Sequence, residues 1–231
     1  MLEATKLTKT YGEHIALDGL DLTVPKGEIF CLLGQNGAGK TTTINLFLGF
    51  IKPTSGSAKV NGVEVSVNGP ESKKHLAYIP EVVMLYGNLT GSENLAYFSR
   101  LAGYKYSKEL LTGFLSKAGL QKEAHLKKLS TYSKGMRQKV GIAIALAKNA
   151  EVILMDEPTS GLDPKATAEF TATVKEMAAE GKSILMATHD IFNAVNVGTR
   201  IGIMKQGALV HTLHTRDITA SELQDLYLET I

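Results

Sequence analysis

The strongest local pattern in this chain is the stretch Gly34-Gln35-Asn36-Gly37-Ala38-Gly39-Lys40-Thr41. It fits G-x-x-x-x-G-K-[ST], a pattern whose glycines let consecutive backbone N–H groups turn toward one phosphate. The strand-like residues 28–33 precede it and the helix-like residues 42–48 follow it, so a helix N-terminus adds its dipole to the loop. We predict a phosphate-binding strand–loop–helix unit, with Lys40 reaching the β- and γ-phosphates and the Thr41 hydroxyl on Mg²⁺.

Two further apolar runs also end in polar residues. Residues 151–155 lead into Asp156 and Glu157, and residues 183–188 lead into His189. Open parallel sheets bind ligands at the carboxyl ends of their strands, so these side chains are expected beside the glycine loop. We predict that Asp156 holds Mg²⁺, that Glu157 orients or deprotonates the attacking water, and that His189 contacts the γ-phosphate. Acidic strand ends and single histidines also occur as ordinary structural features, and the loop favours the catalytic interpretation.

The rest of the chain predicts strands, then helices, then an alternation of both. Residues 1–30 contain short strands separated by turns at Tyr11-Gly12, Asp18-Gly19 and 25–27, and Asn61-Gly62 predicts a hairpin. A helical pattern covers about 90–148 and opens with the capping-box spacing of Thr90 to Glu93. A further helix is expected over 164–180, between an Asp163 N-cap and Gly181. Strands alternating with helices predict a parallel sheet wrapped by helices.

Composition limits the possible partners. The 231 residues carry 25 Lys and Arg against 23 Asp and Glu, a net charge of +2 that is scattered, which argues against a nucleic-acid stripe or a polybasic anchor. The single cysteine, Cys31, lies in an apolar run and predicts a buried thiol in a reducing cytosol. The longest apolar stretch is about eight residues against the ~20 needed for a membrane span, so the chain alone is expected to cross no membrane. Without metal-ligand spacing, five histidines are expected at the surface: 14, 75, 125, 211 and 214.

The stretch Tyr132-Ser133-Lys134-Gly135-Met136-Arg137-Gln138-Lys139-Val140 distinguishes between nucleotide-binding proteins. It resembles the signature L-S-G-G-Q-x-Q-R-V of ATP-binding cassette (ABC) proteins, and Ser133 has the position of an N-cap for the following helix. The resemblance covers essentially the whole chain. It implies an α/β fold: a P-loop NTPase (RecA-like) parallel-sheet core with an N-terminal antiparallel β subdomain and an inserted helical subdomain. The core and β subdomain are expected over about 1–86 and 149–231, and the helical subdomain over about 87–148.

The resemblance also implies a site and a second copy. Two ATP molecules are expected between two head-to-tail domains, each held by the glycine loop of one domain and the signature of the other. The implied ATP-binding residues are Tyr11, Gly34, Gln35, Asn36, Gly37, Ala38, Gly39, Lys40, Thr41, Thr42, Ser133, Gly135 and Asp163. The implied catalytic residues are Glu157, His189 and Lys40, and the implied Mg²⁺ ligands are Thr41, Asp156 and Glu81. Tyr11 matches the aromatic residue that stacks on adenine, although a turn tyrosine is the alternative.

Three departures from the family pattern bear on the predicted site. Lys134 and Met136 replace a glycine and a glutamine of the signature, which leaves the backbone donors in place. Glu81 stands where the family usually has glutamine, so its direct contact with Mg²⁺ stays open. These departures are similar to those of bacterial exporters that handle antibiotics, peptides, lipids or sodium.

The predicted function is that of an ATP-hydrolysing subunit that powers transport by a separate transmembrane permease, most simply an exporter. Residues 82–106 are expected to line the groove that receives the permease, with ordinary subdomain core as the alternative. The implied partners are a second copy or a homologous ATPase domain and the permease, with no nucleic acid. The implied location is cytoplasmic and peripheral, at the inner face of the cell membrane. A soluble ABC ATPase of cluster assembly is the main alternative, and a small-molecule kinase leaves residues 132–140 without a role.

Overall fold

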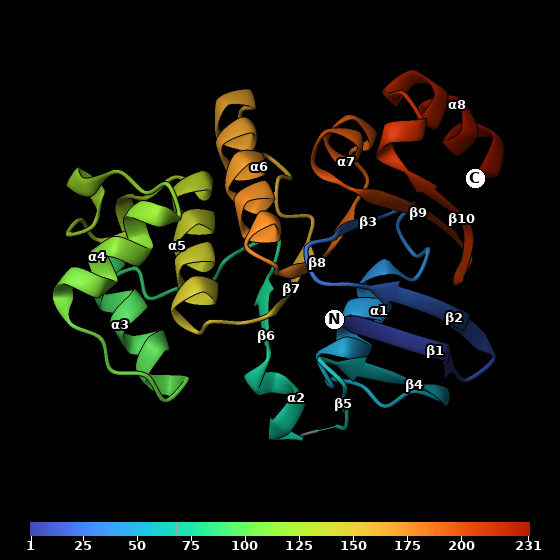
Figure 1. Cartoon of the computed structure of the whole chain (residues 1–231), viewed down its shortest axis with the longest axis horizontal. Coiled ribbons are helices and arrows are strands. Elements are labelled where there is room, and N and C mark those ends of the chain that lie inside the picture. Colours follow the sequence, from blue (N-terminus) through green and yellow to red (C-terminus); the bar gives the residue numbers. More distant parts are fainter. Residues whose placement is uncertain (68) are drawn as a thin grey trace.

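The computed structural model describes residues 1–67 and 69–231, which form two sheets and the helices around them (Figure 1). The strands are β1 (Leu2–Tyr11), β2 (His14–Val24), β3 (Ile29–Gly34), β4 (Ser55–Val60), β5 (Val63–Glu64), β6 (Leu76–Ile79), β7 (Val152–Asp156), β8 (Ser183–Thr188), β9 (Arg200–Lys205) and β10 (Ala208–His214). The α-helices are α1 (Lys40–Phe47), α2 (Pro70–Lys74), α3 (Gly91–Leu101), α4 (Lys108–Lys117), α5 (Lys134–Ala147), α6 (Pro164–Ala179), α7 (Ile191–Val197) and α8 (Ala220–Thr230). Short 3₁₀ turns are η1 (Lys122–Ala124), η2 (Leu129–Thr131) and η3 (Thr215–Asp217).

The larger sheet has six strands in the order β10-β9-β3-β8-β7-β6. All neighbouring pairs are parallel except β10 with β9, which form an antiparallel hairpin at the edge. The register pairs Leu33 with Thr188 and Asp156 with Ala187, so the three strands that end in polar residues finish at one edge. The predicted α/β fold with a parallel-sheet core is confirmed.

The smaller sheet has four strands in the order β2-β1-β4-β5 and is antiparallel. The predicted hairpin is confirmed, because Val60 pairs with Val63 around Asn61 and Gly62, which have φ of 51° and 80°. The predicted turn at Asp18-Gly19 is wrong. Residues 18–19 form an irregularity within one long strand β2, since the Gly19 N–H donates to the Thr8 hydroxyl instead of to the β1 ladder.

Two cores lie on opposite faces of the parallel sheet. Along β3, Ile29, Cys31 and Leu33 face one core, and Phe30 and Leu32 face the other, as the two-residue period of a strand requires. The first core is formed with α3 to α8, and the second with α1 and the antiparallel sheet, which lies below the parallel sheet in Figure 1. The predicted burial of Cys31 is confirmed, and burial raises the pKa of its thiol to about 12.

The helices α3, α4 and α5 form a group at one end of the molecule (left in Figure 1). The predicted capping box is present, since the Thr90 hydroxyl accepts from the Glu93 N–H and the Glu93 carboxylate accepts from the Thr90 N–H.

Charged residues are not evenly divided between this helical group and the rest of the chain. Residues 87–148 carry 11 Lys and Arg against 3 Glu, and the rest of the chain carries 14 against 20 acidic residues. The charges therefore segregate between the helical group and the remainder, although they look scattered along the sequence.

The prediction that the unassigned histidines lie at the surface is wrong for His125. Its side chain is 4% exposed, and its Nε2 lies 3.0 Å from the Leu120 carbonyl oxygen, a partner that the spacing of histidines along the chain does not reveal. His75 is half-buried, with its Nδ1 2.9 Å from a Glu151 carboxylate oxygen. Among residues 1–67 and 69–231, every helix is too short or too polar to span a bilayer.

Candidate functional site

The glycine loop bends sharply between β3 and α1. Gly37 and Gly39 have φ of 83° and 107°, in the left-handed region that favours glycine. A Cβ on Gly39 would lie 2.7 Å from the Ala16 carbonyl oxygen, and one on Gly34 would lie 2.8 Å from that of Met204. The β1–β2 hairpin and the end of β9 therefore press on the loop from both sides, which requires glycine at these positions and holds the backbone in place.

Lys40 is the first residue of α1 and is 6% exposed. Its Nζ donates to the Gly34 and Gln35 carbonyl oxygens at 2.5 and 3.2 Å and lies 4.0 Å from Glu157 Oε1. Burial lowers the pKa of this ammonium group, and the nearby carboxylates of Glu157 and Asp156 oppose that shift. Lys40 thus places a positive charge inside the loop that faces the end of β7.

The two carboxylates after β7 have different contacts. Asp156 Oδ2 accepts from the Thr41 hydroxyl at 3.2 Å, and burial is the main cause that raises the pKa of Asp156. Glu157 Oε2 lies 2.9 Å from His189 Nδ1 and accepts from the His189 N–H at 3.3 Å. Glu157 also has a φ of 46°, which is rare outside glycine and aims its side chain at the loop.

Lys40, Thr41, Asp156 and Glu157 border one cavity of about 370 Å³, whereas His189 contacts Glu157 but is not among the lining residues. Its lining residues are Tyr11, His14, Ala16, Gln35, Asn36, Gly37, Gly39, Lys40, Thr41, Thr42, Glu81, Asp156 and Glu157. Tyr11 stands at the rim, about half exposed, with the Lys9 Nζ 4.8 Å from the centre of its ring. The structure therefore brings together most of the residues that the loop motif and the strand ends pointed to.

The donor set fits a partial magnesium site. Thr41 and Asp156 offer hard oxygen ligands of the kind that Mg²⁺ selects, and phosphate oxygens usually supply the rest of its coordination. Within the described part of the chain, groups of three or more His, Cys, Asp or Glu placed to hold a metal are absent, so the protein alone offers no closed cage.

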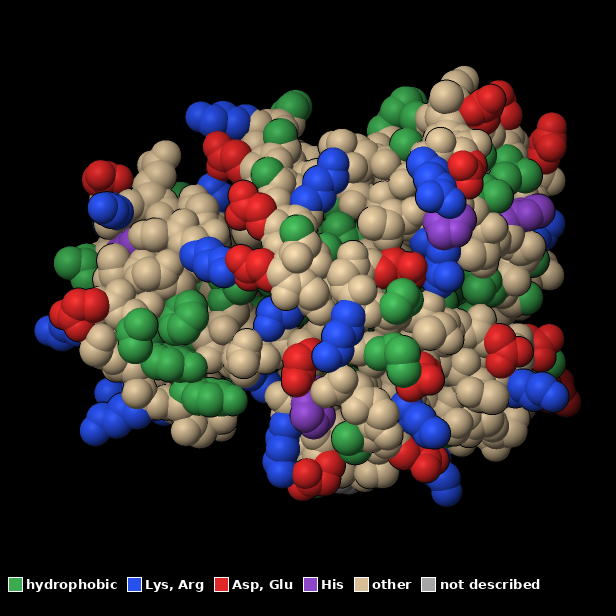
Figure 2. Space-filling model, in the orientation of Figure 1, with side chains coloured by type: hydrophobic (Ala, Val, Ile, Leu, Met, Phe, Trp, Pro, Cys, Tyr) green, Lys and Arg blue, Asp and Glu red, His purple; other side chains and the backbone are tan. Residues whose placement is uncertain are grey.

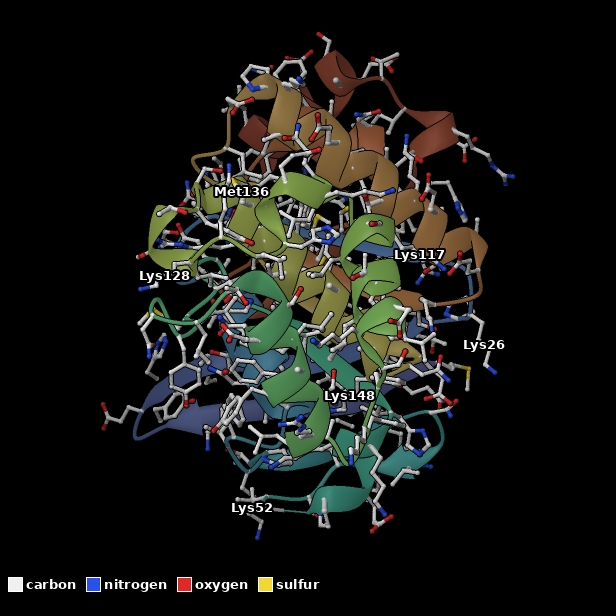
Figure 3. All side chains as sticks on the ribbon, turned by 90° about the vertical axis from the view of Figure 1, so that its left-hand side faces the viewer. Lys26, Lys52, Lys117, Lys128, Met136 and Lys148 are labelled. Carbon is white, nitrogen blue, oxygen red and sulfur yellow. The ribbon has the colours of Figure 1, made fainter. Side chains whose placement is uncertain are left out.

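Five of the expected ATP-binding residues do not line this cavity: Gly34 and Ala38, which belong to the glycine loop itself, and Ser133, Gly135 and Asp163, which lie elsewhere. The Ser133 hydroxyl accepts from the Met136 N–H at 3.3 Å and caps α5, and Gly135 packs where a Cβ would meet Ala166. The Asp163 carboxylate caps α6 by accepting from the Ala166 N–H at 2.9 Å. Viewed toward the helical end, Met136 of α5 and Lys128 lie along one side of the molecule and Lys117 along the other (Figure 3).

Sequence reasoning missed two neighbours of the cavity. His14 and Ala16 line it because the hairpin at Tyr11-Gly12 folds β2 back beside the glycine loop. The tight turn after Tyr11 was a usable signal, since it places His14 directly opposite Tyr11.

Comparisons with known proteins agree with this geometry. The family model described as ABC transporter matches residues 17–160. The chain is 36% identical over 214 residues to the bacitracin transport ATP-binding protein BcrA of Bacillus licheniformis, which covers 92% of this chain and 69% of that protein. It is 33% identical over 231 residues to the probable multidrug ABC transporter ATP-binding protein YbhF of Escherichia coli (strain K12), covering 97% of this chain but only 39% of that protein.

The fold comparison adds a solved structure. The dimeric post-hydrolysis state of the ATP-binding cassette MJ0796, bound to ADP and Pi, superposes with a TM-score of 0.82 at 28% sequence identity. The match covers 94% of this chain and 99% of that one. On the glycine loop, the strand ends, the signature and these matches, the chain belongs to the ABC transporter family, as an ATP-binding subunit that hydrolyses ATP.

Proposed function

We propose that this chain powers an exporter by binding ATP in the cavity described above, pairing head to tail with a second copy or a homologous ATPase domain, and docking on a separate permease. The observation that carries the nucleotide site is the contact of Thr41 with Asp156, which joins the glycine loop to the carboxylates of β7. The names of BcrA and YbhF, a bacitracin transport protein and a probable multidrug transporter protein, support transport over cluster assembly.

The cavity suggests a role for each group. Backbone N–H groups of the loop and the α1 N-terminus bind the phosphates, and Lys40 exchanges its carbonyl partners for the β- and γ-phosphates. Thr41 and Asp156 hold Mg²⁺, and the position of Glu81 on the cavity lining makes it a further candidate ligand. When bound, the ion neutralises charge on the triphosphate.

Glu157 is proposed as the general base. His189 holds Glu157 Oε2 through two contacts, while Oε1 faces Lys40, so the carboxylate has one orientation in the cavity. The Glu157 carboxylate accepts the proton of the water that attacks the γ-phosphate. His189 is the polar contact to that phosphate, and Tyr11 at the rim is the surface on which adenine stacks.

The second copy is proposed to supply the signature. Ser133 is exposed at the N-terminus of the 14-residue helix α5, where a hydroxyl, backbone N–H groups and the helix dipole suit a phosphate. Ser133, Gly135 and Asp163 lie outside their own chain's cavity, which supports the proposal that they contact the nucleotide of the partner.

The permease surface is proposed on the loop before α3 and on α3 itself. Val82, Met84 and Tyr86 are exposed and available to a partner, whereas Val83 is buried and Leu85 packs against the core. Hydrophobic side chains gather over α3 at the lower left of Figure 2. Exposed apolar patches of this kind mark protein contacts.

The proposed location is the inner face of the cell membrane. The net positive charge of residues 87–148 suits the negative cytoplasmic leaflet, to which each nearby Lys or Arg adds about 1 kcal/mol of attraction.

Fractionation of cells that express matched variants tests the permease surface. Met84→Glu, at a position 82% exposed in the patch, is expected to release the chain from membranes, and Leu126→Glu, 78% exposed elsewhere on the helical group, is expected to leave it bound. Equal membrane recovery of both variants would contradict the proposed surface. The purified membrane complex is expected to contain an integral membrane protein.

A further inference from the structure

Two charged residues that depart from the family pattern, Lys134 and Glu81, meet in the structure. Lys134 Nζ, in the first turn of α5, lies 3.7 Å from Glu81 Oε1, and the Ser160 hydroxyl donates to the same oxygen at 3.0 Å. These three residues come from the helical group, the segment after β6 and the loop after β7. One carboxylate oxygen therefore connects three segments that are far apart in sequence.

The backbone around Glu81 is fixed by the same helix. Gln138 is 1% exposed, and its Nε2 donates to the Pro80 and Glu81 carbonyl oxygens at 3.2 and 3.0 Å. Lys134 and Gln138 are four residues apart on α5 and thus share one face. Gln138 holds the main chain of this segment, and Lys134 holds its side chain.

The position of Glu81 gives this contact an electrostatic consequence. Glu81 lines the nucleotide cavity with Asp156 and Glu157, so three carboxylates face a space that is proposed to take a triphosphate. Lys40 supplies a positive charge among the residues that line the cavity. Lys134 approaches Glu81 from outside the cavity and supplies a counter-charge that a glycine at this position cannot supply.

We propose that Lys134 is a positioning residue for ATP binding: together with Ser160 it holds and neutralises the Glu81 carboxylate at the cavity rim, within one chain. This inference rests on the proposed nucleotide site. Lys134 and Glu81 are a matched pair, in which the lysine of the signature compensates for the charge that replaces the usual glutamine.

The expected effect of Lys134 on ATP binding is limited by the exposure of the ion pair. The side chains of Lys134 and Glu81 are 33% and 51% exposed, and ion pairs of this exposure change an equilibrium by up to about fivefold. The Ser160 hydrogen bond restricts the carboxylate, so less entropy is lost when the lysine pairs with it.

The test is a double-mutant cycle on the Kd for ATP, measured by calorimetry on the purified chain in EDTA so that hydrolysis does not occur. Lys134→Met is expected to raise this Kd by about three- to fivefold, because Glu81 then repels the triphosphate without compensation. In the Glu81→Gln background the same substitution is expected to change the Kd by less than about 1.5-fold. Lys128→Met, at an exposed lysine of the same helical group, is the matched control and is expected to bind like the wild type.

The salt dependence of the loss separates an effect of charge from an effect on structure. The loss in Lys134→Met is expected to shrink with added salt, which screens the carboxylate. An equal loss in the Glu81→Gln background, no loss at all, or a loss that ignores salt would overturn the proposal. A wild-type chain that does not bind ATP would instead overturn the nucleotide site itself.

Discussion

At the scale of single residues, the site depends on which oxygen or nitrogen each side chain has as its neighbour. Lys40, Thr41, Asp156 and Glu157 follow two strand ends that the parallel sheet brings side by side, and the contacts of 3.2 and 4.0 Å between them follow from that. Burial acts on them in opposite directions, because it lowers the pKa of Lys40 and raises that of Asp156. A ligand of opposite charge would therefore favour the charged form of each group: a phosphate for the Lys40 ammonium and Mg²⁺ for the Asp156 carboxylate.

Glu157→Gln tests the proposed base. The amide keeps the shape of the side chain but does not accept a proton, so we expect ATP turnover to fall by about 10²- to 10⁴-fold. The Kd for ATP should change little, because the loop and Lys40 are intact. Turnover by phosphate release and binding by calorimetry measure both, and near-normal turnover would remove Glu157 from the chemistry.

Asp156→Asn tests the buried carboxylate. Because the folded-state pKa of Asp156 is raised, the group stabilises the fold most when it is protonated at low pH, and that contribution is lost as the pH rises through the raised pKa. We expect the variant to unfold no more easily than the wild type at neutral pH, yet to lose Mg²⁺-dependent ATP affinity. Chemical denaturation and calorimetry check the two halves, with the exposed Asp225→Asn as control. A less stable variant that keeps its Mg²⁺ dependence would contradict this account.

The roles of the residues in the glycine loop and at the strand ends could be predicted from the sequence because their patterns are local. Gly39 and Lys40 belong to one short motif with one backbone requirement, and Asp156 and Glu157 follow directly from an apolar strand. The ion pair of Lys134 with Glu81 could not be predicted from the sequence, because it depends on how α5 packs beside the segment after β6. The partner of His125 was missed for the same reason.

At the scale of elements, capping side chains explain where the helices begin. Thr90, Ser133 and Asp163 each accept a backbone N–H three residues on, at the starts of α3, α5 and α6. These starts were predictable because capping is a short-range pattern. The unbroken strand β2 was not, because side-chain contacts to Thr8 and Asp21 bridge the irregularity at Gly19.

Two substitutions of Ser133 distinguish its effect on the stability of α5 from its proposed contact with ATP. Ser133→Ala removes the cap and is expected to cost about 1 kcal/mol of unfolding free energy. Ser133→Asp keeps an accepting oxygen at this position, so the free energy of unfolding is expected to stay near that of the wild type, while the added charge repels the partner's ATP. Denaturant unfolding and ATP-dependent dimerisation measured on both variants check this. A Ser133→Asp variant that dimerises normally would exclude the signature from the nucleotide contact.

At the scale of the whole molecule, the two parts of the proposed ATP site lie on two different surfaces of the chain. The cavity at the carboxyl edge of the sheet holds the loop and the carboxylates, and the exposed start of α5 holds the signature. The parallel sheet and its cover of helices followed from the alternation of strands and helices in the sequence. The uneven charge of the helical group became visible only when the chain was divided by structure.

Sedimentation of the Glu157→Gln variant with Mg²⁺ and ATP tests the proposed head-to-tail dimer, because this variant is expected to bind ATP without turning it over. We expect a dimer at saturating ATP that holds two nucleotides and is lost when ADP replaces ATP or when Ser133→Asp is added. A variant that stays monomeric with ATP bound, or a dimer that forms equally with ADP, would contradict this proposal.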